Sequence, residues 1–255
     1  MIPVSEVKSL MDTNMEFTGE RMIPGKVDSA LLMEHLARYR FAMKYSNDRK
    51  VLDAACGAGY GTYMLSKNAS EAVGMDFSAE AVRYASENYK AGNVKFVTGD
   101  VTSMPFDNGS FDLITAFEIF EHVENPQKML KEMSRVLRKD GIILISTPNA
   151  DYEKSTVKNK FHVKEYNLEE FGEILRKELD GVIEIIAQRS TSSASGLKRL
   201  LIQIKRTLGI GPLIGKPVQS ITSPDELLSI TPPYKFENVD IKNAETFIAM
   251  IRPGK

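Results

Sequence analysis

The stretch Val51-Leu52-Asp53-Ala54-Ala55-Cys56-Gly57-Ala58-Gly59-Tyr60-Gly61 decides the fold of this chain. It begins as a short apolar strand and continues as a glycine-rich turn. Glycine lets the backbone come close to a ligand, above the N-terminus of the helix that follows. The spacing is G-x-G-x-G, with Thr62 where a dinucleotide-binding sequence needs Gly or Ala. The carboxylate of Asp53 at the strand end is also better suited to a ligand with a cationic amino group than to a pyrophosphate.

Outward from this stretch, predicted strands and helices alternate along the chain. Such alternation predicts a parallel sheet with helices on both faces. Ser78 is the expected N-cap of one helix. We expect strands at 51–54, 72–75, 94–97, 111–116, 142–146, 182–187 and 245–251, and helices at about 28–45, up to 67, 78–89, 126–137 and 168–178.

The alternation stops at about residue 189, where the sequence becomes Ser-rich, then basic and amphipathic, then rich in Gly and Pro. We therefore expect an insertion between the last two strands. The predicted organisation is an N-terminal lid loop and helix at 1–48, a core at 49–188 and 236–255, and a basic amphipathic insertion at 189–235.

Composition narrows the function classes. Lys plus Arg number 33 and Asp plus Glu 34, for a net charge of -1, which argues against a nucleic-acid coat protein but not against a local basic patch. Cys56 is the single cysteine, so no internal disulfide forms, as suits a reducing compartment. The first residues lack a signal-peptide pattern, and no apolar run approaches the roughly 20 residues of a membrane span. A cytoplasmic location is expected.

Acidic residues stand at the ends of the first three predicted strands. Ligands of open α/β sheets bind at the carboxyl ends of the strands. Asp76 is placed to accept both hydroxyls of a ribose, and Asp100 to accept a hydrogen bond from an adenine amino group. Each acid alone is explained equally well as a solvated strand end or a helix cap. The ordered set of Asp53, Asp76 and Asp100 with the glycines favours a ligand site.

In these motifs the sequence resembles class I S-adenosylmethionine-dependent methyltransferases. Residues 51–61 resemble their first motif, and Phe111–Glu118 and Leu137–Ile142 resemble later ones; the similarity covers about 50–178. The resemblance implies a Rossmann-like seven-stranded sheet, six strands parallel and one antiparallel, and S-adenosylmethionine as cofactor. It implies that Asp53, Gly57 and Gly59 hold the methionine end, Asp76 the ribose, and Asp100 with Val101 the adenine. The full predicted cofactor set is Asp53, Ala55, Gly57, Gly59, Asp76, Phe77, Asp100, Val101 and Phe117.

The first motif departs from the family at one residue and agrees with it at the cysteine. Ala55 stands where the family usually has Gly, which is tolerable if its φ is negative. Cys56 stands where the family often has a cysteine, and we expect it to pack rather than to react.

The fourth strand continues as Phe117-Glu118-Ile119-Phe120-Glu121-His122, at the end of the sheet that faces the methyl group in this fold. If Glu118, Glu121 and His122 lie in one helical turn, their side chains share a face. His162 follows the fifth strand, so its loop should overhang the same edge. Two carboxylates and two imidazoles there would suit magnesium or another divalent metal, which could bind a substrate diol and lower the pKa of a hydroxyl.

This part of the sequence resembles the metal site of small-RNA 3′-end 2′-O-methyltransferases, and its E-x-x-E-H part resembles ubiquinone-biosynthesis O-methyltransferases. That resemblance implies Glu118, Glu121, His122 and His162 as metal ligands. The alternative is a site without metal, in which His122 is a general base or a polar wall residue. Glu118, Glu121 and His122 are the candidate catalytic residues under both interpretations. His35, on a helix face, is expected to pack.

Two further segments have two interpretations each. Asn149 lines the acceptor pocket or forms a turn. The basic amphipathic segment at 197–208 is interpreted as a helix that contacts an anionic membrane or a phosphate-bearing substrate, or as a lid helix that packs on the domain. Gly19-Glu20-Arg21 is interpreted as part of a lid over the cofactor. This loop, the next helix and the segment around His162 also resemble bacterial and archaeal methyltransferases associated with surface glycans.

The leading functional hypothesis is methylation of a hydroxyl on a small molecule or a glycan, including a lipid-linked one. The second is 2′-O-methylation of an RNA end, which the even charge balance weakens. A non-catalytic S-adenosylmethionine-binding protein and a nucleotide-binding oxidoreductase are the alternatives of other classes. The polar cluster near the methyl group weakens the first of these, and the missing G-x-G-x-x-G weakens the second.

Overall fold

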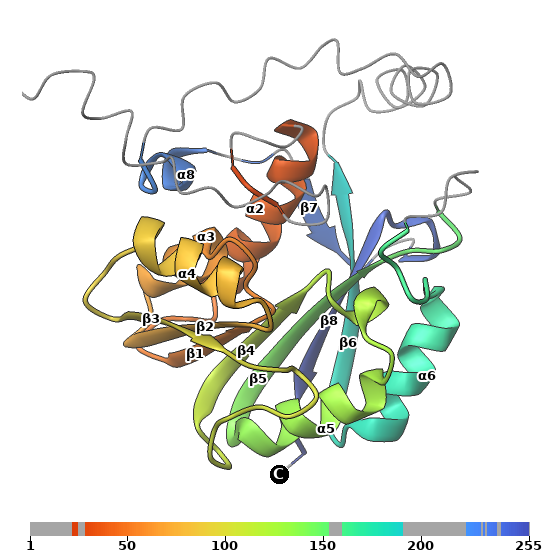
Figure 1. Ribbon diagram of the computed structural model, residues 1–255. Coiled ribbons are helices and arrows are strands. Elements are labelled where there is room, and N and C mark those ends of the chain that lie inside the picture. The colour runs from red at the N-terminus through yellow and green to blue at the C-terminus, as the bar shows by residue number, and fades with distance from the viewer. Residues whose placement is uncertain are drawn as a thin grey trace, which may run out of the picture.

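The computed structural model describes residues 22–24, 29–152, 160–190, 223–230, 232, 234–238 and 241–254. Within them a single sheet of eight strands has the order β3-β2-β1-β4-β5-β8-β6-β7 (Figure 1). The strands are β1 Lys50–Ala54, β2 Glu71–Asp76, β3 Val94–Thr98, β4 Phe111–Phe117, β5 Leu137–Pro148, β6 Val182–Ser190, β7 Tyr234–Glu237 and β8 Thr246–Arg252.

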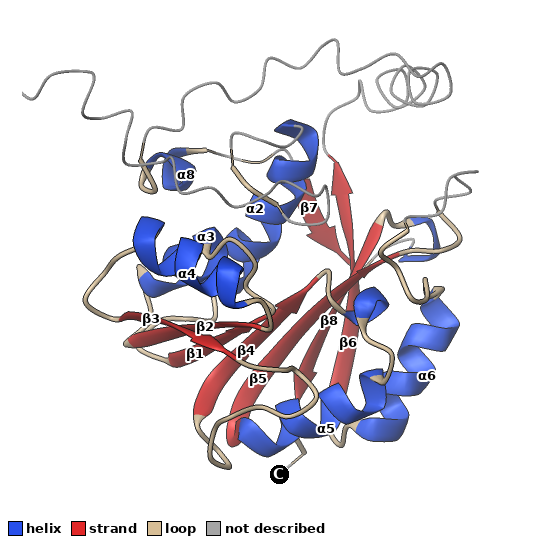
Figure 2. Cartoon of the chain, in the orientation of Figure 1, coloured by secondary structure: helices blue, strands red, loops and turns tan. Residues whose placement is uncertain are grey.

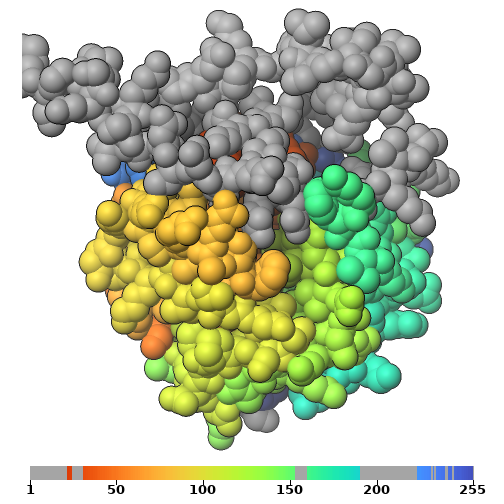
Figure 3. All heavy atoms as spheres, viewed as in Figure 1, coloured from red at the N-terminus to blue at the C-terminus, as the bar shows by residue number. Residues whose placement is uncertain are grey.

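Helices cover both faces of this sheet (Figure 2). They are α2 Ser29–Met43, α3 Tyr60–Ser66, α4 Ala79–Asn88, α5 Pro126–Val136, α6 Leu168–Glu178 and α8 Glu226–Ser229, with short 3-10 helices η2 Phe120–His122 and η3 Ile241–Asn243. Residues of α2, α3 and α4 pack in one apolar cluster, and residues of α5 and α6 in a second cluster. Figure 3 shows one side of the molecule, with α4 in orange-yellow, α5 in yellow-green and α6 in turquoise.

Local sequence explains where these helices begin. The side chain of Ser78 accepts a hydrogen bond from the amide of Ala81, so the predicted cap is confirmed. Asn125 caps α5, and Pro126 occupies the first turn, where its missing N–H costs nothing. Asn167 and Glu170 form a reciprocal capping box at the start of α6.

The sheet has eight strands, so the prediction of seven is wrong in number, although the Rossmann-like arrangement is confirmed. Strands β1 to β6 run in one direction, whereas β7 and β8 are antiparallel to them. The additional strand is β7, which pairs with Ala187–Ser190 at the end of β6. β6 is longer than predicted, and its last residues pair with the four residues of β7. A strand this short, directly after prolines, has too few residues for an apolar pattern to predict it.

The fifth strand also begins earlier than predicted. β5 starts at Leu137, directly after α5, and Leu137 pairs with Phe111 before a register shift. No glycine or proline separates helix from strand here, so the boundary depends on pairing with β4 rather than on a local stop signal.

Most of the predicted insertion, including the amphipathic pattern at 197–208, lies outside the described residues, and so does Gly19-Glu20-Arg21. The division into domains therefore stays a prediction. None of the helices in the described part of the chain is long and apolar enough to cross a membrane.

Candidate functional site

The glycine-rich turn lies between β1 and α3, at the carboxyl end of the sheet. Gly57 and Gly59 have positive φ angles of 52° and 88°, in the left-handed region that favours glycine. A Cβ at Gly59 would lie 2.5 Å from the Cβ of Ala85 in α4, so close packing also requires glycine there. At Gly57 a Cβ would meet nothing within 4 Å, which leaves open space beside the backbone.

Ala55 has a φ of 61°, so the expectation of a negative φ at this position is wrong. The turn is left-handed at this position, although alanine stands there. A left-handed alanine costs about 1 kcal/mol or more because its Cβ approaches the following carbonyl oxygen. The conformation is held by the surrounding turn, in which the amide of Cys56 donates to the carbonyl of Met75.

Asp53 is buried at the end of β1, where hydroxyl groups surround its carboxylate. Tyr39 Oη donates to Oδ1 at 3.2 Å, Thr62 Oγ1 to Oδ2 at 2.7 Å, and Thr115 Oγ1 to Oδ1 at 2.8 Å. Burial raises the pKa of Asp53 to about 6, although the hydroxyl groups oppose the shift. Thr62 thus has a role that a Gly or Ala of a dinucleotide-binding turn could not fill.

Asp76 ties the second strand to the glycine-rich turn. Its Oδ2 accepts a hydrogen bond of 2.9 Å from the amide of Gly57, and its Oδ1 accepts one of 3.0 Å from the amide of Ser78. The adjoining Phe77 is 75% exposed, which is unusual for a large apolar side chain and leaves a ring free to cover a flat ligand. The assignment of Asp76 to the ribose and the inclusion of Phe77 in the cofactor set stay predictions.

Asp100 is exposed at the end of β3, and its Oδ1 accepts hydrogen bonds from the amide and hydroxyl of Thr102. These bonds are those of a turn-forming aspartate and leave Oδ2 for another partner. Val101 is partly buried against the core. Phe117 is buried and meets the Tyr39 ring edge to face, with centroids 5.2 Å apart. The thiol of Cys56 is buried and burial raises its pKa, so its thiolate is disfavoured, as a packing role requires.

Glu118, at the end of β4, does not share a helical turn with Glu121 and His122, so that expectation is wrong. Glu118 has a positive φ of 53°, which is not a helical conformation, and η2 begins only at Phe120. Ser146 Oγ donates to Glu118 Oε1 at 2.7 Å and accepts from the Glu118 amide at 3.1 Å. Oε2 lies 3.7 Å from Nη2 of the buried Arg38.

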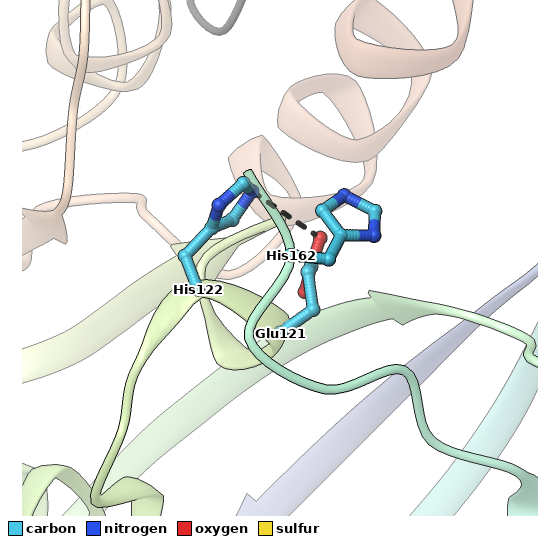
Figure 4. Close-up of side chains that lie close together, drawn as sticks. All are labelled: Glu121, His122 and His162. Atoms are coloured by element: carbon cyan, nitrogen blue, oxygen red, sulfur yellow. Dashed lines mark ion pairs between the residues drawn. The ribbon is translucent and has the colours of Figure 1, made fainter. Parts of the chain in front are cut away.

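Glu121, His122 and His162 come together instead. One ligand atom of each lies within 4.8 Å of the others, and Figure 4 shows the carboxylate between the two imidazoles. Nε2 of His122 is 4.0 Å from Oε1 of Glu121, and the two rings stand at 89° with centroids 4.9 Å apart. The structure thus groups three of the four predicted metal ligands, without Glu118.

Surrounding groups orient these three side chains. Nδ1 of His122 lies 2.9 Å from the carbonyl oxygen of Phe161, which can only accept, so Nδ1 carries the proton and Nε2 presents a lone pair. Nδ1 of His162 lies 3.0 Å from Oε1 of Glu165, which favours the same arrangement. The carbonyl of Glu121 accepts from the amide of Val163 at 2.8 Å and so holds the His162 loop over the site.

The buried carboxylate of Glu121 needs a proton or a cation. Burial, and then the charge of Glu118, raise its pKa well above the ordinary value. Its Oε2 accepts a hydrogen bond of 2.9 Å from Thr147 Oγ1, while Oε1 faces His122. One carboxylate and two imidazoles form a donor set that suits a divalent transition metal or zinc.

Two other predicted positions are structural. Asn149 is buried, its amide nitrogen donates to the carbonyls of Lys242 and Ala244, and its oxygen accepts from the amide of Asp151. The turn-forming interpretation of Asn149 is thus the one the hydrogen bonds support. His35 is partly buried, and burial lowers its pKa well below the ordinary value, in keeping with a packed neutral imidazole.

Pattern reasoning from sequence missed the residues that hold the acids in place. They are Arg38, Tyr39, Thr62, Thr115, Ser146 and Thr147. Four of the six are hydroxyl residues at strand ends or in the first turn of α3, a weak signal that becomes visible only when neighbouring strands are aligned.

Comparison with known proteins agrees with this geometry. Residues 52–145 match the family described as a methyltransferase domain. A protein of Mycolicibacterium smegmatis described as a probable S-adenosylmethionine-dependent methyltransferase is 30% identical over 165 residues, 63% of each chain. A ubiquinone biosynthesis O-methyltransferase of Glaesserella parasuis is 29% identical over 121 residues, 42% of this chain and 51% of that protein. The chain thus spans about three fifths or less of the length of these relatives.

The fold has solved neighbours. The crystal structure of the YcgJ protein of Bacillus subtilis superposes with a TM-score of 0.58 at 21% identity, over 86% of this chain and 99% of that one. At this identity the likeness concerns the fold alone. The match over residues 52–145 agrees with the predicted family, and the solved neighbour confirms the predicted fold class.

Proposed function

Since residues 52–145 belong to the methyltransferase domain family, we propose that the chain transfers a methyl group from S-adenosylmethionine to a hydroxyl group, with a divalent metal held by Glu121, His122 and His162. The observation that carries the proposal is this three-residue cluster, in which Glu121 and His122 follow β4 and His162 comes from the loop before α6. Strand β4 pairs directly with β1, after which the glycine-rich turn lies. A cofactor bound along β1 and β2 would bring its methyl group toward the end of β4.

The cofactor side of the site follows the order of the strands. Gly57 and Gly59 leave the turn accessible, Asp76 offers carboxylate oxygens for a ribose, and Phe77 offers a free aromatic face for the base. Asp53 acts here through the fold, because its oxygens bind hydroxyl groups of α2, α3 and β4. It fixes the turn to which the methionine end of the cofactor would bind.

Methyl transfer is a displacement in which the S–CH₃ bond breaks as the O–CH₃ bond forms and the acceptor hydroxyl loses its proton. The methyl group on a sulfonium is already activated for transfer, so the protein has to position the acceptor hydroxyl and provide for the removal of its proton. A divalent ion at the cluster would lower the pKa of a hydroxyl bound to it. Thr147, Phe161 and Glu165 keep the three ligand side chains in the required orientation.

The acceptor class that we propose is a hydroxyl of a small molecule or of a glycan, including a lipid-linked one. The distant similarity to a ubiquinone biosynthesis O-methyltransferase supports oxygen as the methylated atom. The near-zero net charge favours a small or neutral acceptor over RNA. Methylation of an RNA 3′ end is the second candidate, because one carboxylate and two imidazoles around a metal could also hold the two hydroxyls of a terminal ribose.

The test is transfer of labelled methyl from S-adenosylmethionine into fractionated cell extract, with and without a chelator. Label in a small-molecule, glycan or lipid fraction, lost with chelator and restored by a divalent metal, is the expected result. Label in RNA would promote the second candidate. Label that is indifferent to chelator would overturn the metal and leave Nε2 of His122 as the proton acceptor. Absence of label in every fraction would indicate a binding protein without turnover.

The cytoplasmic location and a membrane contact through 197–208 stay predictions. They are tested by fractionation of cells and by binding of the protein to vesicles that contain anionic lipid.

A further inference from the structure

A buried arginine faces the methyl-acceptor end of the site. The Arg38 side chain, on α2, is fully buried, at 0% exposure. Its Nη1 donates to Oε1 of Gln188 at 2.8 Å, but neither Nε nor Nη2 has a hydrogen-bond partner among the described residues. A buried guanidinium is always charged, so this arrangement is costly unless an opposite charge compensates it. Nη2 points to that charge, since Oε2 of Glu118 lies 3.7 Å away.

The other oxygen of Glu118 is fixed as well. Ser146 is fully buried in β5, and its Oγ both donates to Oε1 of Glu118 and accepts from the Glu118 amide. One hydroxyl therefore fixes the backbone and the side chain of the same residue. That backbone is left-handed at a non-glycine position, which costs of order 1–3 kcal/mol and persists only where neighbours enforce it.

The position of Glu118 explains why such fixing would matter. Glu118 directly follows β4, three residues before the proposed ligand Glu121, and its side chain is 18% exposed. It lies near enough to Glu121 to help raise the pKa of that group. It is nevertheless absent from the three-residue metal cluster. It is thus a separate, partly exposed carboxylate beside the cluster.

We propose that Arg38 and Ser146 are positioning residues that hold the Glu118 carboxylate to accept a hydrogen bond from the methyl acceptor. This inference rests on the proposed function. The carboxylate orients the acceptor hydroxyl, while the cluster of Glu121, His122 and His162 binds metal. An orienting hydrogen bond of this kind acts on kcat, because a misplacement of about 1 Å at the reacting group can reduce the rate by about 10²-fold.

The test compares the wild type with R38M, R38K and S146A, and with R40M as the matched control. Arg40 is on the same helix, and its guanidinium donates to the carbonyl of Leu228 rather than facing Glu118. Each variant is crystallised to locate Glu118, and S-adenosylhomocysteine affinity and methyl transfer into the labelled extract fraction are measured. S146A keeps Arg38 in place, so it provides the test if R38M fails to fold.

In R38M and S146A we expect the Glu118 carboxylate to leave its place and kcat to fall by about 10²-fold, with S-adenosylhomocysteine affinity within about twofold of the wild type. R38K should restore part of the loss, and R40M should match the wild type. Glu118 in an unchanged position in R38M and S146A, or a displaced Glu118 with unchanged kcat, would overturn the inference. A wild type without methyl transfer would instead refute the proposed function, and the crystal structures would still decide whether Arg38 and Ser146 position Glu118.

Discussion

Two non-glycine residues with a left-handed backbone conformation directly follow two adjacent strands. Ala55 follows β1 and Glu118 follows β4, and the two strands pair directly. Such conformations cost free energy and cluster where the chain must present groups to a ligand. At Ala55 the one sign of this in the sequence is the Gly that the resembled family usually has there, because alanine adopts a positive φ only at a cost that neighbours must offset.

Replacing Ala55 by Gly should therefore stabilise the protein. A55G removes the cost of a left-handed alanine, which should raise the free energy of unfolding by about 1 kcal/mol. The greater conformational entropy of glycine in the unfolded chain offsets part of this gain. Urea unfolding measures the change. A58G is the matched control, because Ala58 lies in the same turn without a positive φ, and it should destabilise. If A55G destabilises as much as A58G, the assigned strain is absent.

Asp53 makes stability depend on pH. Its pKa is about 6 in the folded protein and about 3.9 in an unfolded chain, so between these values the folded state binds more protons. The free energy of unfolding should therefore fall as the pH rises from about 4 to 6, by up to about 3 kcal/mol from this group.

The D53N variant isolates that contribution. It should lose this part of the fall between pH 4 and 6 in urea unfolding, whereas E121Q, which removes another buried carboxyl group, should keep it. Equal pH profiles for D53N and the wild type would show that Asp53 titrates normally in the folded protein.

At the scale of elements, buried side-chain amides connect segments that the sequence leaves far apart. Asn149 follows β5 and binds carbonyls of Lys242 and Ala244, beside η3. N149A would leave these carbonyls and the Asp151 amide without a partner and should lower the free energy of unfolding by about 2 kcal/mol. N68A, at an exposed residue with one bond to the Met43 carbonyl, should change it by about 0.5 kcal/mol or less.

Cofactor affinity distinguishes the two roles considered for Asn149. Calorimetry with S-adenosylhomocysteine should give the same affinity for N149A and the wild type at a temperature where both are folded. A selective loss of affinity in a stable N149A protein would return Asn149 to the ligand pocket.

Most elements could be predicted because their signals are local. Ser78 and Asn125 cap helices, and α6 was predicted with both ends correct at 168–178. β7 and the start of β5 could not be predicted in this way, since both depend on pairing partners elsewhere in the chain. The same distinction applies to the site: the acids stand at strand ends visible in the sequence, whereas Arg38 and Ser146 meet Glu118 only after folding.

At the scale of the whole molecule, the sheet order brings the two halves of the proposed reaction together. β1 and β2 carry the turn and the acid for the cofactor, and β4 and the loop before α6 carry Glu121, His122 and His162. The two apolar helical layers keep this edge in place from both faces of the sheet. Metal binding and cofactor binding should thus be separable, because they use different strands.

The most direct measurement of that claim compares H162A and E121A with the wild type, for turnover and for S-adenosylhomocysteine affinity together. Loss of turnover by at least about 10²-fold with affinity within about twofold is the predicted result, since both residues lie on the acceptor side. Equal loss of turnover and affinity, or unchanged turnover in both variants, would contradict the account.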